Sequence, residues 1–345
     1  MSLALFSILI SFIFNGFLII PFINFLYRQK IQRQEQKTKD PFNKPATIFD
    51  KFHHHKKGTP VGGGILIIVT TTILFLFYFF VYFLIRKKII TLYPSVFEEI
   101  KIILFTFISF SILGLYDDLT KIFFWKKTSF FGLRFRYKLI LEIVLASFIS
   151  YWLYTDLKIN FIYIPFFGVF NLGLFYPIFA AFVIVSFANA VNITDGLDGL
   201  AVGCLMIALF SFLVIARSII DIPISLFLSA WLGGIFAFLY FNIYPARIFL
   251  GDSGALSFGA TYATIGLILG KTFALVVIGG IFVLEILSSF VQLLAKKYLK
   301  RKILPVAPLH LTLQLIGWSE PKIVMRFWLI QILFSIFGLM IAFAK

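Results

Sequence analysis

The chain contains very little cysteine and few acidic residues. Its 345 residues include one cysteine, Cys204, which excludes an internal disulfide and is interpreted as a small packing residue in an apolar run. Aspartate and glutamate number 15 against 31 lysines and arginines, so the formal net charge is +16. No internal repeat and no long polar linker is visible. The sequence therefore predicts a single domain, residues 1–345.

Apolar residues dominate what is present. They make up 61% of the chain, and the mean hydropathy is +1.00, which is typical of a polytopic helical membrane protein. An outer-membrane barrel would need short segments of alternating apolar and polar residues, whereas these runs are continuously apolar. The first 27 residues lack the basic start and the cleavage site of a signal peptide, so a retained first helix is expected.

The apolar runs predict an all-α fold of about ten transmembrane helices, since each span needs about 20 apolar residues. The predicted helices cover residues 3–27, 61–85, 101–117, 137–155, 175–190, 199–217, 223–243, 254–270, 273–296 and 322–343. Between residues 156 and 174 the sequence alternates and carries Pro165 and Gly168, which favours a small external β-hairpin at the membrane surface.

Basic residues cluster in short segments between the apolar runs. The loops on one face hold or flank most of them, and these loops are residues 28–60, 118–136, 191–198, 244–253 and 297–321. By the positive-inside rule this face is cytoplasmic, and both termini lie outside. The cluster Arg86–Lys88 is basic on the opposite face and departs from the rule. Such a distribution indicates membrane orientation and argues against nucleic-acid binding.

One third of the acidic residues gather at the predicted cytoplasmic helix ends. They are Asp117, Asp118, Asp195, Asp198 and Asp252. Asp195 and Asp198 lie three residues apart, a spacing that places two side chains on one face of a helix. Carboxylates concentrated at one depth, on an otherwise basic face, predict a bound cation.

Helix capping is the competing interpretation of these acids. An Asp or Thr before a helix satisfies free N–H groups, and Asp252 or Thr194 could do only that. Capping does not explain the adjacent pair Asp117 and Asp118, because a second like charge beside the first is unfavourable. Mg²⁺ takes oxygen ligands from one or two carboxylates and from substrate phosphates. Lys121 adds a positive charge for phosphate, so the set predicts Mg²⁺-dependent phosphoryl chemistry.

Five stretches occur in the order found in a known family. They are "HHHKKGTPVGGG", "GLYDDLTK", "NAVNITDGLDGLA", "YFNIYPARIFLGDSGA" and "PLHLTLQLIGWSEPKIVMRFW", and they span residues 53–328. The chain resembles the polyprenyl-phosphate N-acetylhexosamine-1-phosphate transferases, most of all the MraY branch, the phospho-N-acetylmuramoyl-pentapeptide transferases. The resemblance implies a transferase that uses Mg²⁺, UDP-MurNAc-pentapeptide and polyprenyl (undecaprenyl) phosphate and gives lipid I and UMP in peptidoglycan synthesis. A transferase for UDP-GlcNAc or another UDP-sugar stays the alternative.

The resemblance also implies residue roles. Asp252 matches the Mg²⁺ ligand, Asp117 the proposed base for the lipid phosphate, and Asp118 its catalytic neighbour. A phosphomonoester has a second pKa near ~6, so Asp117 is expected to matter more for positioning than for proton removal. The matching substrate-binding residues are Lys57, Lys121, Asn192, Asp195, Asp198, Asn242, Phe249 and His310. Among them, Asn242 and Phe249 match residues near the uracil, where the Phe249 ring can stack on the base.

The last loop departs from the family pattern. The MraY branch usually carries three consecutive histidines after a proline, whereas this chain keeps His310 and has Leu311 and Thr312 next. The sequence therefore leaves the exact UDP-sugar open. His53–His55 form a separate cluster on a basic loop, where a zinc site would lack a fourth nearby ligand. Glu285 is an acid inside an apolar helix, which marks it either as functional or as a hydrogen-bond partner of kinked backbone.

Two other function classes compete with the transferase. A transporter would place ionisable residues near the bilayer midplane and show repeats, yet only Glu142 and Glu285 lie well inside apolar segments. An inactive scaffold would tolerate loss of Asp117 or Asp252, and both are present. The expected partners are the UDP-sugar, the polyprenyl phosphate and the membrane, with a homodimer left open. The expected location is the inner (plasma) membrane, with the active site on the cytoplasmic face.

Overall fold

The computed structural model describes residues 2–33, 56–85, 89–124 and 135–344, so His53–His55 and Arg86–Lys88 lie outside the described residues. The described residues form twelve α-helices and one pair of strands. The helices are α1 (Ser2–Arg28), α3 (Gly63–Leu84), α4 (Val96–Leu119), α6 (Phe135–Thr155), α7 (Tyr176–Thr194), α8 (Leu200–Ser218), α9 (Ile222–Asn242), α10 (Asp252–Ile268), α11 (Thr272–Ile278), α12 (Gly280–Leu294), α13 (Leu309–Leu315) and α14 (Glu320–Phe343).

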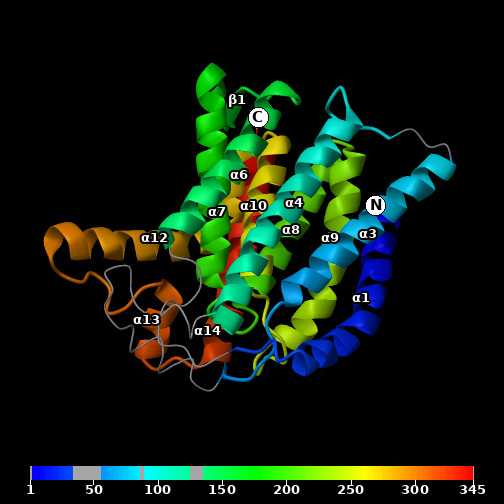
Figure 1. Cartoon of the computed structure of the whole chain (residues 1–345). Helices are drawn as coiled ribbons and strands as arrows, with labels where there is room; N and C mark the ends of the chain where they lie inside the picture. Colours follow the sequence, from blue (N-terminus) through cyan, green and yellow to red (C-terminus); the bar gives the residue numbers. More distant parts are fainter. Residues whose placement is uncertain (1, 34–55, 86–88, 125–134, 345) are drawn as a thin grey trace.

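The long helices form one bundle (Figure 1). Each of the ten predicted ranges holds a helix, although the ninth is broken in two. In the described residues seven helices are long and apolar enough to cross a membrane, or up to eight if the bent pair α11 and α12 counts as one span. α4 and α10 are not among the seven, and they pack against each other inside the bundle. The all-α polytopic fold is confirmed, whereas the number of ten spans stays a prediction.

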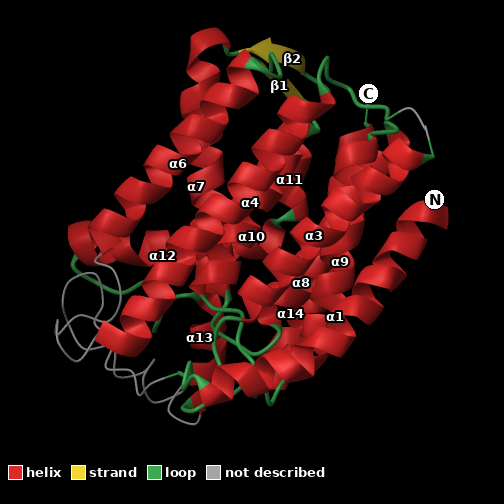
Figure 2. Cartoon of the chain, turned by 45° about the vertical axis from the view of Figure 1, so that its right-hand side comes forward, coloured by secondary structure: helices red, strands yellow, loops and turns green. Residues whose placement is uncertain are grey.

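A small β-hairpin lies at one end of the bundle (Figure 2). β1 (Phe161–Ile164) pairs antiparallel with β2 (Gly168–Asn171), as the alternating sequence predicts. The Tyr163 hydroxyl donates to the backbone carbonyl of Ala344 at 3.0 Å, which fastens the hairpin to the end of α14. We call this the hairpin end. The opposite end, where α4 and α7 finish and α10 begins, is the site end.

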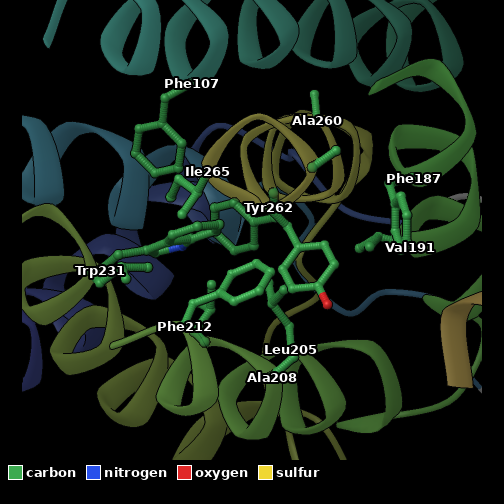
Figure 3. Packing of buried hydrophobic residues seen from close by; sticks show 14 of the residues in the cluster. Phe107, Phe187, Val191, Leu205, Ala208, Phe212, Trp231, Ala260, Tyr262 and Ile265 are labelled. Carbon is green, nitrogen blue, oxygen red and sulfur yellow. The ribbon is translucent and has the colours of Figure 1, made fainter. Parts of the chain in front are cut away.

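α10 lies in the buried centre of the bundle. Every residue of Ser253–Ile268 is buried, and none of these residues is charged. Aromatic rings fill the space around it (Figure 3). Tyr262 stacks on Phe212 with 4.8 Å between ring centroids, and Trp231 meets Phe258 edge-on at 5.1 Å. This packing fixes the position of the first turn of α10 at the site end.

Glycines allow close helix contacts at the site end. A Cβ on Gly114 of α4 would collide with the backbone of Asp252, and one on Gly64 of α3 would collide with the backbone of Gly254 in the first turn of α10. Small residues at such contacts are common in membrane proteins because they let two backbones touch. The close approach brings Asp117 and Asp118, in the last turn of α4, against the N-terminus of α10.

The prediction of one continuous helix over 273–296 is wrong. α11 and α12 meet at a bend of 79°, with Gly279 and Gly280 at the break. Glycine is a poor helix former, and a Cβ on Gly280 would lie 2.5 Å from the ring of Phe334. Packing against α14 therefore requires glycine where helix propensity disfavours it. Beyond the bend, α12 leaves the bundle sideways (Figure 1).

Candidate active site

Asp117 and Asp252 share two positively charged partners at the site end. Asp117 is 2% exposed in the last turn of α4, and Asp252 is the first residue of α10. The Nζ atom of Lys138 lies 3.0 Å from Asp117 Oδ2 and 2.5 Å from Asp252 Oδ2. The Nζ atom of Lys121 lies 3.1 Å and 2.9 Å from the same two atoms. Two ammonium groups therefore connect two carboxylates.

The two lysines come from either side of the site. Lys121 lies in the helical turn Thr120–Phe124 that follows α4, and Lys138 lies in the first turn of α6. Burial opposes the charge on Lys121, but the carboxylates of Asp252 and Asp117 outweigh it and raise its pKa. Lys121 is a predicted site residue, whereas Lys138 is not. The only signal for Lys138 in the sequence is its position as a charged residue inside an apolar helix.

Asp118 has a different environment from its neighbour. Its carboxylate accepts hydrogen bonds from the backbone N–H groups of Asp252 and Ser253, both at 3.0 Å. It therefore caps α10 from another helix, while the N-cap position of α10 itself is Gly251, whose φ of 80° suits glycine. Helix capping thus explains Asp118, and Asp252 is not the cap. The predicted catalytic role of Asp118 stays a prediction.

The carboxylate pair fits a hard divalent cation. Among the described residues no group of three or more His, Cys, Asp or Glu side chains is placed to hold a metal ion. A cation between Asp117 and Asp252 would therefore have two protein carboxylates and would complete its shell with water and phosphate oxygens, as Mg²⁺ commonly does. The ammonium groups of Lys121 and Lys138 already place two positive charges on the same oxygen atoms. The oxygen donors therefore suit Mg²⁺, which would compete with these ammonium groups for the same atoms.

A buried ion-pair cluster holds the 195–199 loop between α7 and α8. The Nζ atom of Lys56 lies 2.6 Å from Asp198 Oδ1 and 2.6 Å from Glu320 Oε1, and all three side chains are buried. Glu320 Oε1 also accepts from the backbone N–H of Asp198 at 2.6 Å, and Asp198 Oδ2 accepts from that of Ala246 at 2.9 Å. Asp198, a predicted substrate contact, therefore connects three segments of the chain.

Two cationic side chains lie near the ring of Phe249. Lys56 Nζ is 5.9 Å and the Arg33 guanidinium carbon 5.3 Å from the ring centroid. Burial lowers the pKa of Arg33, and the charge of Asp195 opposes that shift. The structure buries Lys56 and exposes the predicted Lys57. Sequence alone could not distinguish two adjacent lysines on a loop, because no periodicity fixes the direction in which either points.

The amide of Asn242 is already satisfied by backbone groups. Its Oδ1 accepts from the N–H of Gly199 at 3.2 Å, and its Nδ2 donates to the carbonyl of Ile248 at 2.9 Å. Asn242 is buried in this position. The residue predicted to lie near the uracil therefore holds the 195–199 loop against the segment that precedes α10.

Asn192 and Asp195 occupy the more open part of the same region. Both side chains are partly exposed at the end of α7. Loss of hydration, together with the negative charge of Asp252, raises the pKa of Asp195 well above its usual range. The 195–199 loop and the carboxylate pair both lie at the site end, after the end of α7 and at the start of α10.

His310 reaches the same loop from α13. Its Nδ1 lies 3.0 Å from Oε2 of Glu285 on α12, and its backbone N–H donates to Glu285 Oε1 at 3.1 Å. A Cβ on Gly196 would lie 2.5 Å from Nε2 of His310, so this nitrogen faces the 195–199 loop. Glu285 is thus the partner that orients His310. The sequence indicated Glu285 only as an acid in an apolar helix.

The residues after His310 do not replace the missing histidines. Leu311 is buried, and the Thr312 hydroxyl donates to the backbone carbonyl of Val306. Gln314 is partly exposed, and its Oε1 atom has no hydrogen-bond partner among the described residues. His310 is therefore the side chain of this loop that is held and directed toward the site.

Comparisons with known proteins identify the family of this chain. Residues 100–270 match the profile described as Glycosyl transferase family 4. A phospho-N-acetylmuramoyl-pentapeptide-transferase from Borrelia turicatae is 38% identical over 257 residues, in a match that covers 69% of this chain and 72% of that protein. The protein of the same name from Borreliella burgdorferi (strain ZS7) is 37% identical over 258 residues, with the same coverage of 69% and 72%.

The chain belongs to the phospho-N-acetylmuramoyl-pentapeptide-transferase family. The expectation of a membrane transferase of this branch is therefore confirmed. A further relative with this name, from Borrelia duttonii, is 38% identical over 247 residues, which cover 66% of this chain and 69% of that protein. The matched region 100–270 contains both carboxylates of the pair and the 195–199 loop. The individual roles of the site residues stay predictions.

Proposed function

We propose that this chain transfers phospho-N-acetylmuramoyl-pentapeptide from its UDP derivative to polyprenyl (undecaprenyl) phosphate, releasing UMP and forming lipid I for peptidoglycan synthesis. Family membership supports the reaction class. The observation that carries the proposal is the pair Asp117 and Asp252 joined by Lys121 and Lys138. Alternating negative and positive groups at one end of a membrane bundle suit two substrates that each bring phosphate.

Mg²⁺ is the proposed cofactor. Asp252 and Asp117 would hold it through the oxygen atoms that now contact Lys121 and Lys138. When bound, the cation would neutralise charge on the pyrophosphate of the UDP-sugar. Asp118 has a positioning role in this proposal, because its cap fixes the first turn of α10 and therefore the place of Asp252.

The proposed nucleophile is an oxygen atom of the polyprenyl phosphate. It forms a bond to the phosphorus that carries the sugar, and the bond from that phosphorus to UMP breaks. Because a phosphomonoester has a second pKa near ~6, the oxygen is largely deprotonated at neutral pH. Lys121, which lies 3.1 Å from Asp117 Oδ2, would hold the lipid phosphate in line for attack.

The UDP-sugar is proposed to lie against the 195–199 loop. Phe249 offers a ring for stacking on the uracil, and Arg33 lies beside that ring, where a phosphate could reach it. In the imidazolium form His310 would donate from Nε2 to a phosphate or sugar oxygen, while its Nδ1–H donates to Glu285. The buried cluster of Lys56 with Asp198 would keep the loop in shape.

The site end is proposed to face the cytoplasm at the inner (plasma) membrane. The basic loops gather at this end, which the positive-inside rule assigns to the cytoplasmic side. A nucleotide-sugar made in the cytoplasm and a lipid phosphate at the membrane surface would meet there. The hairpin end would then lie outside.

A UDP-GlcNAc donor is the second candidate, and one observation favours it. Leu311 and Thr312 stand where relatives of this branch carry histidine, and Thr312 is engaged with the backbone. Purified protein with Mg²⁺ and polyprenyl phosphate should release UMP from UDP-MurNAc-pentapeptide at least tenfold faster than from UDP-GlcNAc, a ratio within reach of binding selectivity (about 10–200-fold). The reverse preference would replace the proposed donor while keeping the transferase class.

A further inference from the structure

Glu142 is a buried acid next to the site that the proposed reaction does not use. It lies on α6, one turn after Lys138, and is 0% exposed. Its Oε2 atom accepts from the side-chain amide of Asn189 at 2.5 Å, and that amide also donates to the carbonyl of Val185 at 3.0 Å. Its Oε1 atom has no hydrogen-bond partner among the described residues. A buried carboxylate oxygen without a partner is unfavourable and calls for an explanation.

The geometry of α6 directs Glu142 toward Lys138. Residues four apart lie on the same face of a helix, and side chains lean toward the helix N-terminus, so Glu142 leans toward the turn that carries Lys138. Lys138 reaches the other way, to Asp117 and Asp252. The flexible four-carbon side chain of Lys138 therefore has acidic groups on two sides. Asp117 and Asp252 lie on the side of the site, and Glu142 lies on the other side.

We propose that Glu142 receives the ammonium group of Lys138 when a divalent cation takes its place between Asp117 and Asp252. This inference rests on the proposed function, because it assumes the cation. A cation and the lysine compete for the same two oxygen atoms and repel each other. Lys121 is 23% exposed at its side chain and Lys138 only 12%, so Lys138 has less access to water and more need of a second partner. The unpartnered Oε1 of Glu142 is that partner, which makes Glu142 a positioning residue.

Binding of Mn²⁺, which stands in for Mg²⁺ and is visible by electron paramagnetic resonance, tests the proposal without turnover. The full-length protein in detergent, without substrates, is titrated and its dissociation constant compared with those of three variants. Glu142→Gln should bind Mn²⁺ roughly tenfold more weakly, within the range of coupling between neighbouring groups. Lys138→Met should bind more tightly, because no lysine has to be displaced. In the double variant the effect of Glu142→Gln should disappear.

A matched control removes a carboxylate far from the site. Glu98, at the hairpin end, contacts Lys101 in a partly exposed ion pair, and Glu98→Gln should leave Mn²⁺ affinity unchanged. Melting temperatures establish that each variant is folded. If Glu142→Gln unfolds, Glu142→Asp replaces it, because this variant keeps the charge and withdraws the carboxylate by one methylene. Glu142→Asp should weaken Mn²⁺ binding less than removal of the charge would.

Three results would overturn the proposal. Unchanged Mn²⁺ affinity in the folded Glu142 variant would overturn this proposal but not the proposed function. The same holds if Glu142→Gln weakens Mn²⁺ binding as much in the double variant with Lys138→Met as it does in the wild-type background. No saturable Mn²⁺ binding by the folded wild-type protein would overturn both this proposal and the metal requirement of the proposed function.

Discussion

Replacing Asp118 with alanine should destabilise the protein through the N-terminus of α10. The carboxylate is 6% exposed and accepts two backbone hydrogen bonds of 3.0 Å each, from Asp252 and Ser253. Loss of an ordinary N-cap costs about 0.5–2 kcal/mol, and a hydrogen bond to a charged group contributes about 1.5–3 kcal/mol. Because two donors would be left in a buried place, we expect a loss of about 2–4 kcal/mol of unfolding free energy.

Thermal unfolding of the purified protein in detergent measures this loss. Asp118→Asn keeps an acceptor oxygen and should lower the melting temperature less than Asp118→Ala. Glu98→Gln is the matched control on the same helix, because Glu98 contacts Lys101 in a partly exposed ion pair at the hairpin end. An Asp118→Ala variant that melts with the wild type would refute the capping role, as would an equally large loss in the Glu98 control.

Three further predictions address other parts of the account. His310→Ala should raise the Michaelis constant for the UDP-sugar by about tenfold or more, since a hydrogen bond to a charged group contributes about 1.5–3 kcal/mol; unchanged constants would remove the loop from the substrate site. Asp195 has a raised pKa in the folded protein, so its ionisation opposes folding. Asp195→Asn should therefore increase the free energy of unfolding more near about pH 8 than near about pH 5. An increase that becomes smaller as the pH rises would contradict this. Cysteines at Ser319 and Asn160 should react with impermeant thiol reagents from opposite sides of the membrane, and labelling from one side would break the topology.

The apolar pattern was enough to predict where the helices lie. Long apolar runs have few alternatives in a membrane, because backbone polar groups must be satisfied inside the segment. The hairpin was also predictable, since its alternation differs from the helical runs around it. The bend at Gly279 and Gly280 was not predictable, because it depends on contacts with α14 that the local sequence does not contain.

The candidate site was predicted in part. The aspartates stood out because acids are scarce in this chain and cluster at helix ends. The division of labour between Asp117 and Asp118 did not follow from the sequence, since it depends on which of two neighbours faces the α10 N-terminus. Lys138 and Lys56 were missed for a related reason. A single lysine in a helix or loop gives no sign of the distant carboxylates that it meets.

The central claim is that Asp252 belongs to a Mg²⁺-dependent phosphosugar transfer site and not to a helix cap. The most direct measurement is UMP release from UDP-MurNAc-pentapeptide and polyprenyl phosphate by the wild type and Asp252→Asn, each with Mg²⁺ and with a chelator. We expect wild-type release that stops on chelation, and release by the folded Asp252→Asn variant that is lower by orders of magnitude at every Mg²⁺ concentration. Near-normal release by this variant at saturating Mg²⁺, or wild-type release that persists in the chelator, would contradict it.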